Sequence, residues 1–178
     1  MIDPIAELKV RAERLHRGVA QGGTPAIERL RALPELRKAA PEALLKFATD
    51  VQRKHCLAVV AREAGFESWA HASAVIAGAP VDESLGLGTA LCPSTFSAHW
   101  NIWSASYEEA RTIRAEHGGW LLAYKRHYFI VDRHYLESLG LDPEDDDWSR
   151  IGRDWARPAD PEARRRLYGK LLVARAVG

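Results

Sequence analysis

Three histidines and one aspartate in the second half of the chain carry side chains that could hold a metal or transfer protons. They are His99, His127, Asp132 and His134. Imidazole and carboxylate groups are common ligands of zinc and iron, and imidazole also exchanges a proton near neutral pH. Their spacing matches no metalloenzyme motif of the H-E-x-x-H kind. Under an enzymatic alternative, His99, His127 and His134 are candidate catalytic residues, and His99, Asp132 and His134 are candidate metal ligands. The preferred interpretation has no catalytic residue, no metal and no cofactor.

Cys56 and Cys92 are the two cysteines of the chain. Two thiols are too few for a disulfide framework or a self-contained zinc knuckle. Cys92 is a further candidate catalytic residue, because a thiolate beside a base is a strong nucleophile. Its candidate base is His99, and Pro93 follows it in a segment of linker-like composition. Free thiols packed inside the protein, in a reducing compartment, are the simpler interpretation of both cysteines.

Aromatic residues are dense in the second half of the chain, and four of them are candidate ligand-binding residues. Trp100, Trp103, Tyr124 and Tyr128 lie in segments with strand-like patterns. A small sheet has too little buried area for so many rings, and aromatic side chains dominate pockets and interaction hot spots. Core packing is the preferred interpretation for most of the rings, and an aromatic surface for a protein or small-molecule partner is the alternative for some of them.

The charge balance gives no bulk attraction to nucleic acid or to an anionic membrane. The chain has 25 Lys and Arg residues against 24 Asp and Glu residues, a net charge of +1. Arg11, Arg14 and Arg17 lie about one helical turn apart, which is typical of a solvated helix face. The turn at residues 65–69 resembles a helix-turn-helix, but the helix after it has no Arg, Lys, Asn or Gln to contact base edges. Nucleic-acid binding is therefore a second alternative, and we disfavour it.

The strongest strand pattern lies at residues 119–132. Two apolar runs, 120–124 and 128–131, flank the polar triplet 125–127, and this arrangement predicts a β-hairpin. Asp-Pro pairs, a capping box at Ser106 and terminal glycines predict the other elements. We expect a strand at 97–103 and helices at 3–20, 24–33, 41–64 with a break near 50, 68–76, 106–117, 133–139, 142–154 and 160–176.

Glycine and proline punctuate the chain between about residues 77 and 95, where no hydrophobic period is present. Helical patterns dominate before this segment, and strands alternate with helices after it. The sequence therefore predicts an α+β protein with two parts. Residues 1–80 form a helical part. Residues 90–178 form a part in which a small, mostly antiparallel sheet, with the hairpin at 119–132 in its centre, packs with helices.

Residues 53–76 resemble a short helical segment found in many bacterial proteins. The shared features are an Ala-Arg-Glu helix end at residues 61–63 and the Gly-Phe-x-Ser-Trp turn at 65–69. In those proteins the segment precedes ankyrin repeats or belongs to a small helical module described as glyoxalase-related. The resemblance implies a helix–turn–helix packing unit without catalytic residues. The sequence has neither a glyoxalase-like metal-ligand pattern nor the ankyrin period of about 33 residues, and residues 90–178 indicate no family.

These patterns predict a bacterial binding or interaction protein without an assembled catalytic motif. Its expected partner is a protein or a small molecule, and no pattern specifies an oligomeric state. The chain shows no signal-peptide pattern and no apolar run long enough for a membrane span, so we expect a cytoplasmic protein that does not bind membranes. The alternatives are a small metal-dependent or acid–base enzyme using His99, His127 and His134, and a nucleic-acid-binding protein.

Overall fold

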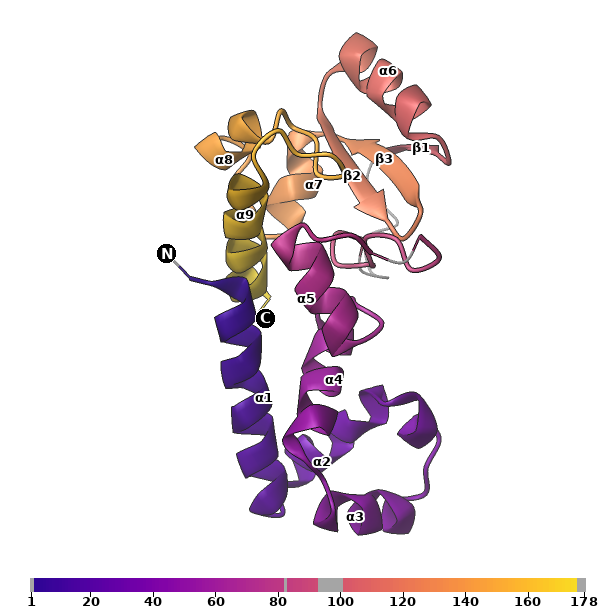
Figure 1. Cartoon of the computed structure of the whole chain (residues 1–178), viewed down its shortest axis with the longest axis vertical. Helices are drawn as coiled ribbons and strands as arrows, with labels where there is room; N and C mark the ends of the chain where they lie inside the picture. Colours follow the sequence, from indigo (N-terminus) through magenta and orange to yellow (C-terminus); the bar gives the residue numbers. More distant parts are fainter. Residues whose placement is uncertain (1, 82, 93–100, 176–178) are drawn as a thin grey trace.

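A computed structural model of the chain describes residues 2–81, 83–92 and 101–175. It confirms the predicted α+β class, because helices pack around a small antiparallel sheet within these residues (Figure 1). No helix in the described ranges is both long enough and apolar enough to cross a bilayer. The first part of the chain contains α1 (Pro4–Ala20), α2 (Thr24–Arg29), the 3-10 turns η1 (Leu30–Ala32) and η2 (Pro34–Leu36), α3 (Pro41–Thr49), α4 (Arg53–Glu63) and α5 (Trp69–Ala77).

The second part alternates strands with helices, as the sequence predicts. It contains β1 (Asn101–Ser104), α6 (Tyr107–His117), β2 (Trp120–Tyr124), β3 (His127–Val131), α7 (Arg133–Ser138), α8 (Asp146–Arg150) and α9 (Pro161–Ala174). Of the strand expected at 97–103, residues 97–100 lie outside the described residues, and β1 covers the rest.

The helix starts follow the capping residues of the sequence. Asp3 and Asp160 accept backbone N–H groups at the starts of α1 and α9, and Ser106 and Asp132 do the same for α6 and α7. These side chains satisfy amides that have no partner inside the helix. The predicted break near residue 50 is confirmed as well, because α3 ends at Thr49 and α4 begins at Arg53.

The helix expected over residues 142–154 is wrong in its extent. Asp142 accepts the Glu144 N–H at 2.9 Å and so forms a turn instead of a helix start. Asp145 then caps α8 by accepting the Asp147 N–H at 3.0 Å. The short side chains of aspartates compete with the helix for backbone amides, and here the second of the two competing caps begins the helix.

The sheet has the order β1-β3-β2, and all its pairings are antiparallel. Tyr124 pairs with His127, so the predicted hairpin turns through Lys125 and Arg126, with Lys125 at a φ of +53°. One face of the hairpin packs into the main core through residues such as Leu122 and Phe129. The other face carries Leu121 and Ile130 against α6.

The segment expected to be a linker is packed between the two parts. Leu87 N–H donates to the Lys125 carbonyl at 3.0 Å, and Lys125 N–H donates to the Gly88 carbonyl at 2.7 Å. Thr89 N–H donates to the Gly65 carbonyl at 2.7 Å. The segment thus connects the turn after α4 to the tip of the hairpin. Buried residues from Leu8 to Leu172 form one hydrophobic cluster that crosses the predicted boundary.

Helix α9 brings the end of the chain back to its beginning. It packs against α1 and α5, while α1 runs alongside α4 (Figure 1). The buried stripe of α1 includes Leu8, Ala12 and Leu15, which follow the helical period. Helix α1 therefore contacts both α4 and α9, and these contacts bring together side chains from distant parts of the sequence.

A buried carboxylate joins α8 to α9. Asp147 is 6 % exposed and accepts hydrogen bonds from Arg166, at 2.9 Å from Nε, and from Lys170, at 2.8 Å. Burial raises the pKa of the Asp147 carboxyl, but the hydrogen bonds from Arg166 and Lys170 outweigh burial and lower the pKa below its ordinary value of 3.8. The charged form of Asp147 therefore stabilises the contact between the two helices.

We expect Asp147→Asn to lower the free energy of unfolding by about 2 kcal/mol at neutral pH, because it removes the charge that two cations share. A lowered folded-state pKa contributes stability that is complete above the unfolded pKa of about 3.8 and is lost as pH falls through the folded pKa. Urea unfolding between neutral pH and pH 3, followed by circular dichroism, measures both effects. Asp146 is exposed, so Asp146→Asn is the matched control. Equal losses in the two variants would contradict this role.

Candidate anion-binding cleft

The candidate histidines do not form a cluster in the described residues. His127 is exposed at the start of β3, and His134 is exposed on α7, where its Nδ1 lies 3.1 Å from Oε2 of Glu137. The length of β3, about 13 Å over four steps, lies between His127 and the start of α7. Asp132 caps α7 by accepting the Tyr135 N–H at 3.0 Å. His99 lies outside the described residues, within which no three His, Cys, Asp or Glu side chains are placed to hold a metal.

The two cysteines occupy packed positions. Cys56 is fully buried on α4, and burial raises the pKa of its thiol. Cys92 is half-buried beside Tyr135, whose hydroxyl donates to the Leu91 carbonyl at 2.7 Å. Burial, with a further contribution from the Cys92 thiol, raises the pKa of Tyr135 above its ordinary range. A neutral phenol of this kind does not serve as the base that a cysteine nucleophile requires.

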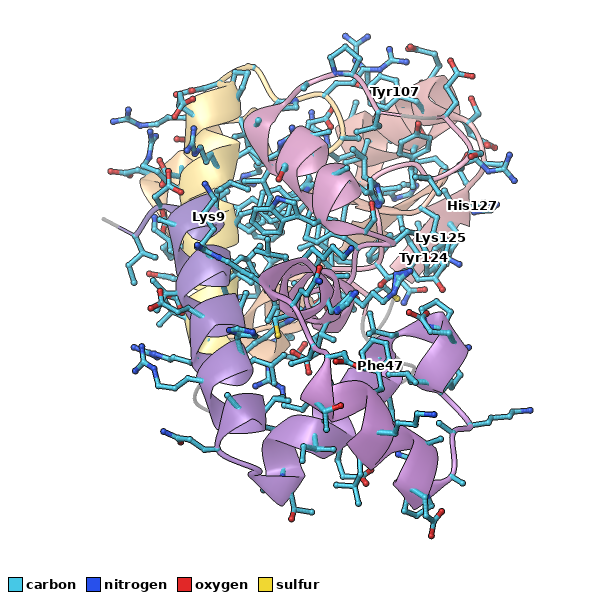
Figure 2. The ribbon with its side chains drawn as sticks, turned by 60° about the horizontal axis from the view of Figure 1, so that its bottom comes forward. Lys9, Phe47, Tyr107, Tyr124, Lys125 and His127 are labelled. Carbon is cyan, nitrogen blue, oxygen red and sulfur yellow. The ribbon has the colours of Figure 1, made fainter. Side chains whose placement is uncertain are left out.

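The candidate aromatic residues divide between the two faces of the sheet. Trp103, 44 % exposed, stacks on Phe129 with ring centroids 4.6 Å apart and meets the edge of Tyr124 at 5.8 Å. Tyr128 lies on the opposite face against Tyr107 of α6, with centroids 5.6 Å apart. Figure 2 shows Tyr124 near Lys125 and His127 at the hairpin end, away from Tyr107. Trp100 lies outside the described residues.

A cleft that the sequence patterns did not indicate lies where α1, α4 and α9 meet. Its volume is about 490 Å³, within the range of small-molecule sites. Four arginines, two glutamates and four apolar residues line it. The arginines are Arg11, Arg14, Arg29 and Arg175, the glutamates are Glu7 and Glu63, and the apolar residues are Leu8, Val60, Ala64 and Leu172. We call this site the arginine cleft.

Helical spacing explains how α1 lines the cleft. Residues three and four apart are neighbours on a helix surface, so Glu7, Arg11 and Arg14 follow one edge of the buried stripe that contains Leu8. Glu63 lies in the last turn of α4, three residues after the buried Val60. Each helix therefore supplies one buried apolar position and, beside it, charged side chains at the rim.

Two of the four arginines are already paired with carboxylates. Arg11 donates from Nε to Glu7 at 2.7 Å and from Nη2 to the Leu172 carbonyl at 2.7 Å, which ties α1 to α9. Arg29 makes a two-pronged contact with Glu63, at 2.8 and 2.7 Å. The hydrogen bonds that Arg29 donates to Glu63 raise the pKa of Arg29. These contacts hold both guanidinium groups in place at the cleft wall.

The other two arginines have no carboxylate partner in the described residues. Arg14 is exposed on α1, and no hydrogen bond or ion pair of its guanidinium group is present in this part of the chain. Arg175 follows α9 and donates to the Ala90 carbonyl. Burial lowers the pKa of Arg175, because desolvation disfavours its charged form. Four arginines against two glutamates give the lining a formal charge of +2.

The arrangement is suited to binding anions. Guanidinium groups stay protonated in proteins, so they donate hydrogen bonds and do not act as bases. Among the described residues, those that line the cleft include no Ser, Cys or His side chain that could attack a substrate. Guanidinium groups at the wall of a cleft are suited instead to the recognition of carboxylate or phosphate groups.

Comparison of the chain with protein-family models, with curated proteins and with solved structures found no match. The resemblance of residues 53–76 to the bacterial helical segment therefore stays a prediction. Locally, α4 is followed by Gly65 at a φ of +95°, and Ser68 caps α5 by accepting the His71 N–H at 3.1 Å.

Proposed function

We propose that this protein binds a small anionic ligand in the arginine cleft and performs no chemistry on it. The observation that carries the proposal is the lining of four arginines and only two carboxylates around a cleft of about 490 Å³. Unbalanced positive charge is unfavourable where burial reduces its hydration, which is the case for the half-buried Arg175 and not for the exposed Arg14. A bound anion removes that penalty, and the aliphatic stems of the arginines add contact area for an organic group.

The burial of α5 favours a small-molecule ligand over a nucleic acid. In a helix-turn-helix reader, the second helix must lie free on the surface to enter the major groove. Here the corresponding helix, α5, buries His71, Ala72, Val75 and Ile76. His71 is fixed on both ring nitrogens, because Nδ1 accepts the Glu67 N–H at 3.1 Å and Nε2 lies 2.9 Å from the Gly86 carbonyl oxygen. Helix α5 is therefore a packing element of the hydrophobic core and is not a free surface helix.

The proposal includes a cytoplasmic location in a bacterium. Its supports are the free thiols of Cys56 and Cys92, which persist in reducing compartments, and the Arg- and Ala-rich composition.

We expect titration calorimetry at low ionic strength to detect saturable binding of at least one of phosphate, sulfate, citrate and benzoate. Arg14→Gln is expected to weaken that binding about tenfold, because it removes one charge-assisted contact worth about 1.5 kcal/mol. Thermal shifts alone do not suffice, since sulfate and phosphate stabilise proteins without binding to a site. Lys9→Gln is the matched control, because Lys9 is exposed on the same helix (Figure 2) but does not line the cleft.

Removal of a carboxylate should have the opposite effect. Glu63→Gln is expected to strengthen anion binding about threefold, because it releases Arg29 and removes a negative charge from the cleft wall. A purely structural role of the Arg29–Glu63 pair would leave the affinity unchanged. If neither these four anions nor an organic phosphate binds saturably to the wild-type protein, the proposed function is wrong.

A further inference from the structure

The two guanidinium groups without carboxylate partners indicate the charge of the ligand. Building on the function proposed above, we infer that the ligand is a small phosphate monoester. Its phosphate dianion contacts Arg14 and Arg175, and its organic body lies against the aliphatic stems of the arginines that line the cleft.

The charge of the phosphate follows from the pairing in the cleft. Glu7 and Glu63 already neutralise Arg11 and Arg29, at distances of 2.7 Å. Arg14 and Arg175 have no carboxylate partner among the described residues and leave two positive charges uncompensated. A single carboxylate or a sulfate ester would balance only one of them. A phosphate monoester carries about two negative charges above its second pKa of about 6, so it balances both.

The geometry of the donors also suits phosphate. A guanidinium group presents its N–H donors in a planar fork that matches two phosphate oxygens at once. Arg175 donates one hydrogen bond to the Ala90 carbonyl, and this bond fixes the position of the remaining N–H donors of its guanidinium group. Arg14 approaches from α1, on another wall of the cleft. The three terminal oxygens of a monoester can accept from both walls, which the two oxygens of a carboxylate do less completely.

The size of the cleft indicates that the phosphate carries an organic group and is therefore an ester. Its volume of about 490 Å³ far exceeds that of a bare phosphate ion. Leu8, Val60 and Leu172 line the cleft but are only 1–4 % exposed, so the aliphatic stems of the arginines form most of its accessible apolar surface. An aryl or alkyl group on the phosphate would displace water from this surface. Inorganic phosphate alone would leave the surface wet and so would bind more weakly.

Phenyl phosphate and phenyl sulfate form a matched pair of probes, because they share shape and differ by one charge near neutral pH. We expect calorimetry on the full chain to show phenyl phosphate binding at least tenfold more tightly than phenyl sulfate and than inorganic phosphate. Lowering the pH from about 8 to about 5 should weaken phenyl phosphate binding several-fold, since the ester loses its second charge near pH 6. Phenyl sulfate binding should hardly change.

Two variants locate the effect. Arg14→Gln should reduce the preference for phenyl phosphate over phenyl sulfate to about threefold or less, whereas Lys9→Gln should retain it. Arg175→Gln should reduce the preference for phenyl phosphate over phenyl sulfate to the same extent as Arg14→Gln. Because Arg175 also holds the Ala90 carbonyl, Arg14→Gln decides the result if Arg175→Gln unfolds.

The outcomes separate this inference from the function on which it rests. Equal affinities for phenyl phosphate and phenyl sulfate, both lost in Arg14→Gln, would contradict the inference that the ligand is a dianion but would be consistent with the anion-binding function. If inorganic phosphate bound as tightly as phenyl phosphate, the inference that the ligand is an ester would be wrong. A phosphoserine peptide or a short RNA that binds at least tenfold more tightly than phenyl phosphate would overturn the small-molecule assignment. Failure of all these probes to bind would reject both the inference and the proposed function.

Discussion

Replacing Gly86 by alanine should destabilise the protein by at least about 3 kcal/mol. Gly86 has a φ of +59°, and an added Cβ would overlap the Lys125 carbonyl and approach the Arg126 nitrogen to 2.9 Å. Positive φ alone costs an alanine about 1 kcal/mol. Relief of the overlap must also separate the segment from the hairpin turn, which breaks the two backbone hydrogen bonds that join Leu87 and Gly88 to Lys125. Each bond contributes about 1 kcal/mol.

Gly22→Ala is the matched control for this substitution. Gly22 has a similar φ of +72°, but no atom of the described residues lies within 4 Å of the position that an added Cβ would occupy. We expect Gly22→Ala to lower the free energy of unfolding by about 1 kcal/mol, the cost of the backbone conformation alone. Urea denaturation monitored by tryptophan fluorescence measures both variants. Similar losses in the two would mean that the contact between residues 86–88 and the hairpin turn contributes little to stability.

Arg164→Met is expected to lower the free energy of unfolding by about 3 kcal/mol. Arg164 is 5 % exposed and donates to the carbonyls of Trp155 and Val75, each at 3.1 Å. It therefore ties α9 to the C-terminal end of α5, where the helix dipole favours a positive charge. Methionine keeps the apolar contacts but leaves both buried carbonyls without this donor, at about 1–3 kcal/mol for each lost contact.

The neighbouring arginine provides the comparison. Arg165 is 33 % exposed and pairs with Asp3 at the surface. Arg165→Met should change stability by about 1 kcal/mol or less, because exposed ion pairs contribute little. Arg164→Lys should not restore stability, since an ammonium group cannot reproduce the planar fork that serves two carbonyls. If Arg164→Lys were as stable as the wild type, charge at the end of α5 alone would explain the role of Arg164.

The local features of the fold could be predicted from the sequence, because their causes are local. The hairpin follows from two apolar runs around a polar break, and β2 and β3 occupy those runs. The starts of α1, α6 and α9 follow from capping side chains within three residues of the amides that they satisfy. The extent of α8 could not be predicted, because Asp142 and Asp145 offer competing caps and only the packing against α9 distinguishes them.

The candidate site could not be predicted from the sequence, because it depends on how distant helices meet. Arg11, Arg14 and Arg17 form a regular stripe, and the spacing is the same for all three. Only packing separates them: Arg17 pairs with Glu13 in solvent at 3.3 Å, whereas Arg11 and Arg14 line the cleft. Arg29 and Arg175 complete the site from α2 and from the end of α9. No local pattern connects these residues to α1.

The most direct test of the arginine cleft is a crystal structure of the protein with tungstate, an oxyanion whose metal scatters anomalously. The account predicts an anomalous peak inside the cleft, within hydrogen-bonding distance of Arg14 and Arg175, and its loss from crystals of Arg14→Gln. Tungstate bound elsewhere with none in the cleft, or a peak in the cleft that persists unchanged in Arg14→Gln, would contradict the claim that these arginines form an anion site.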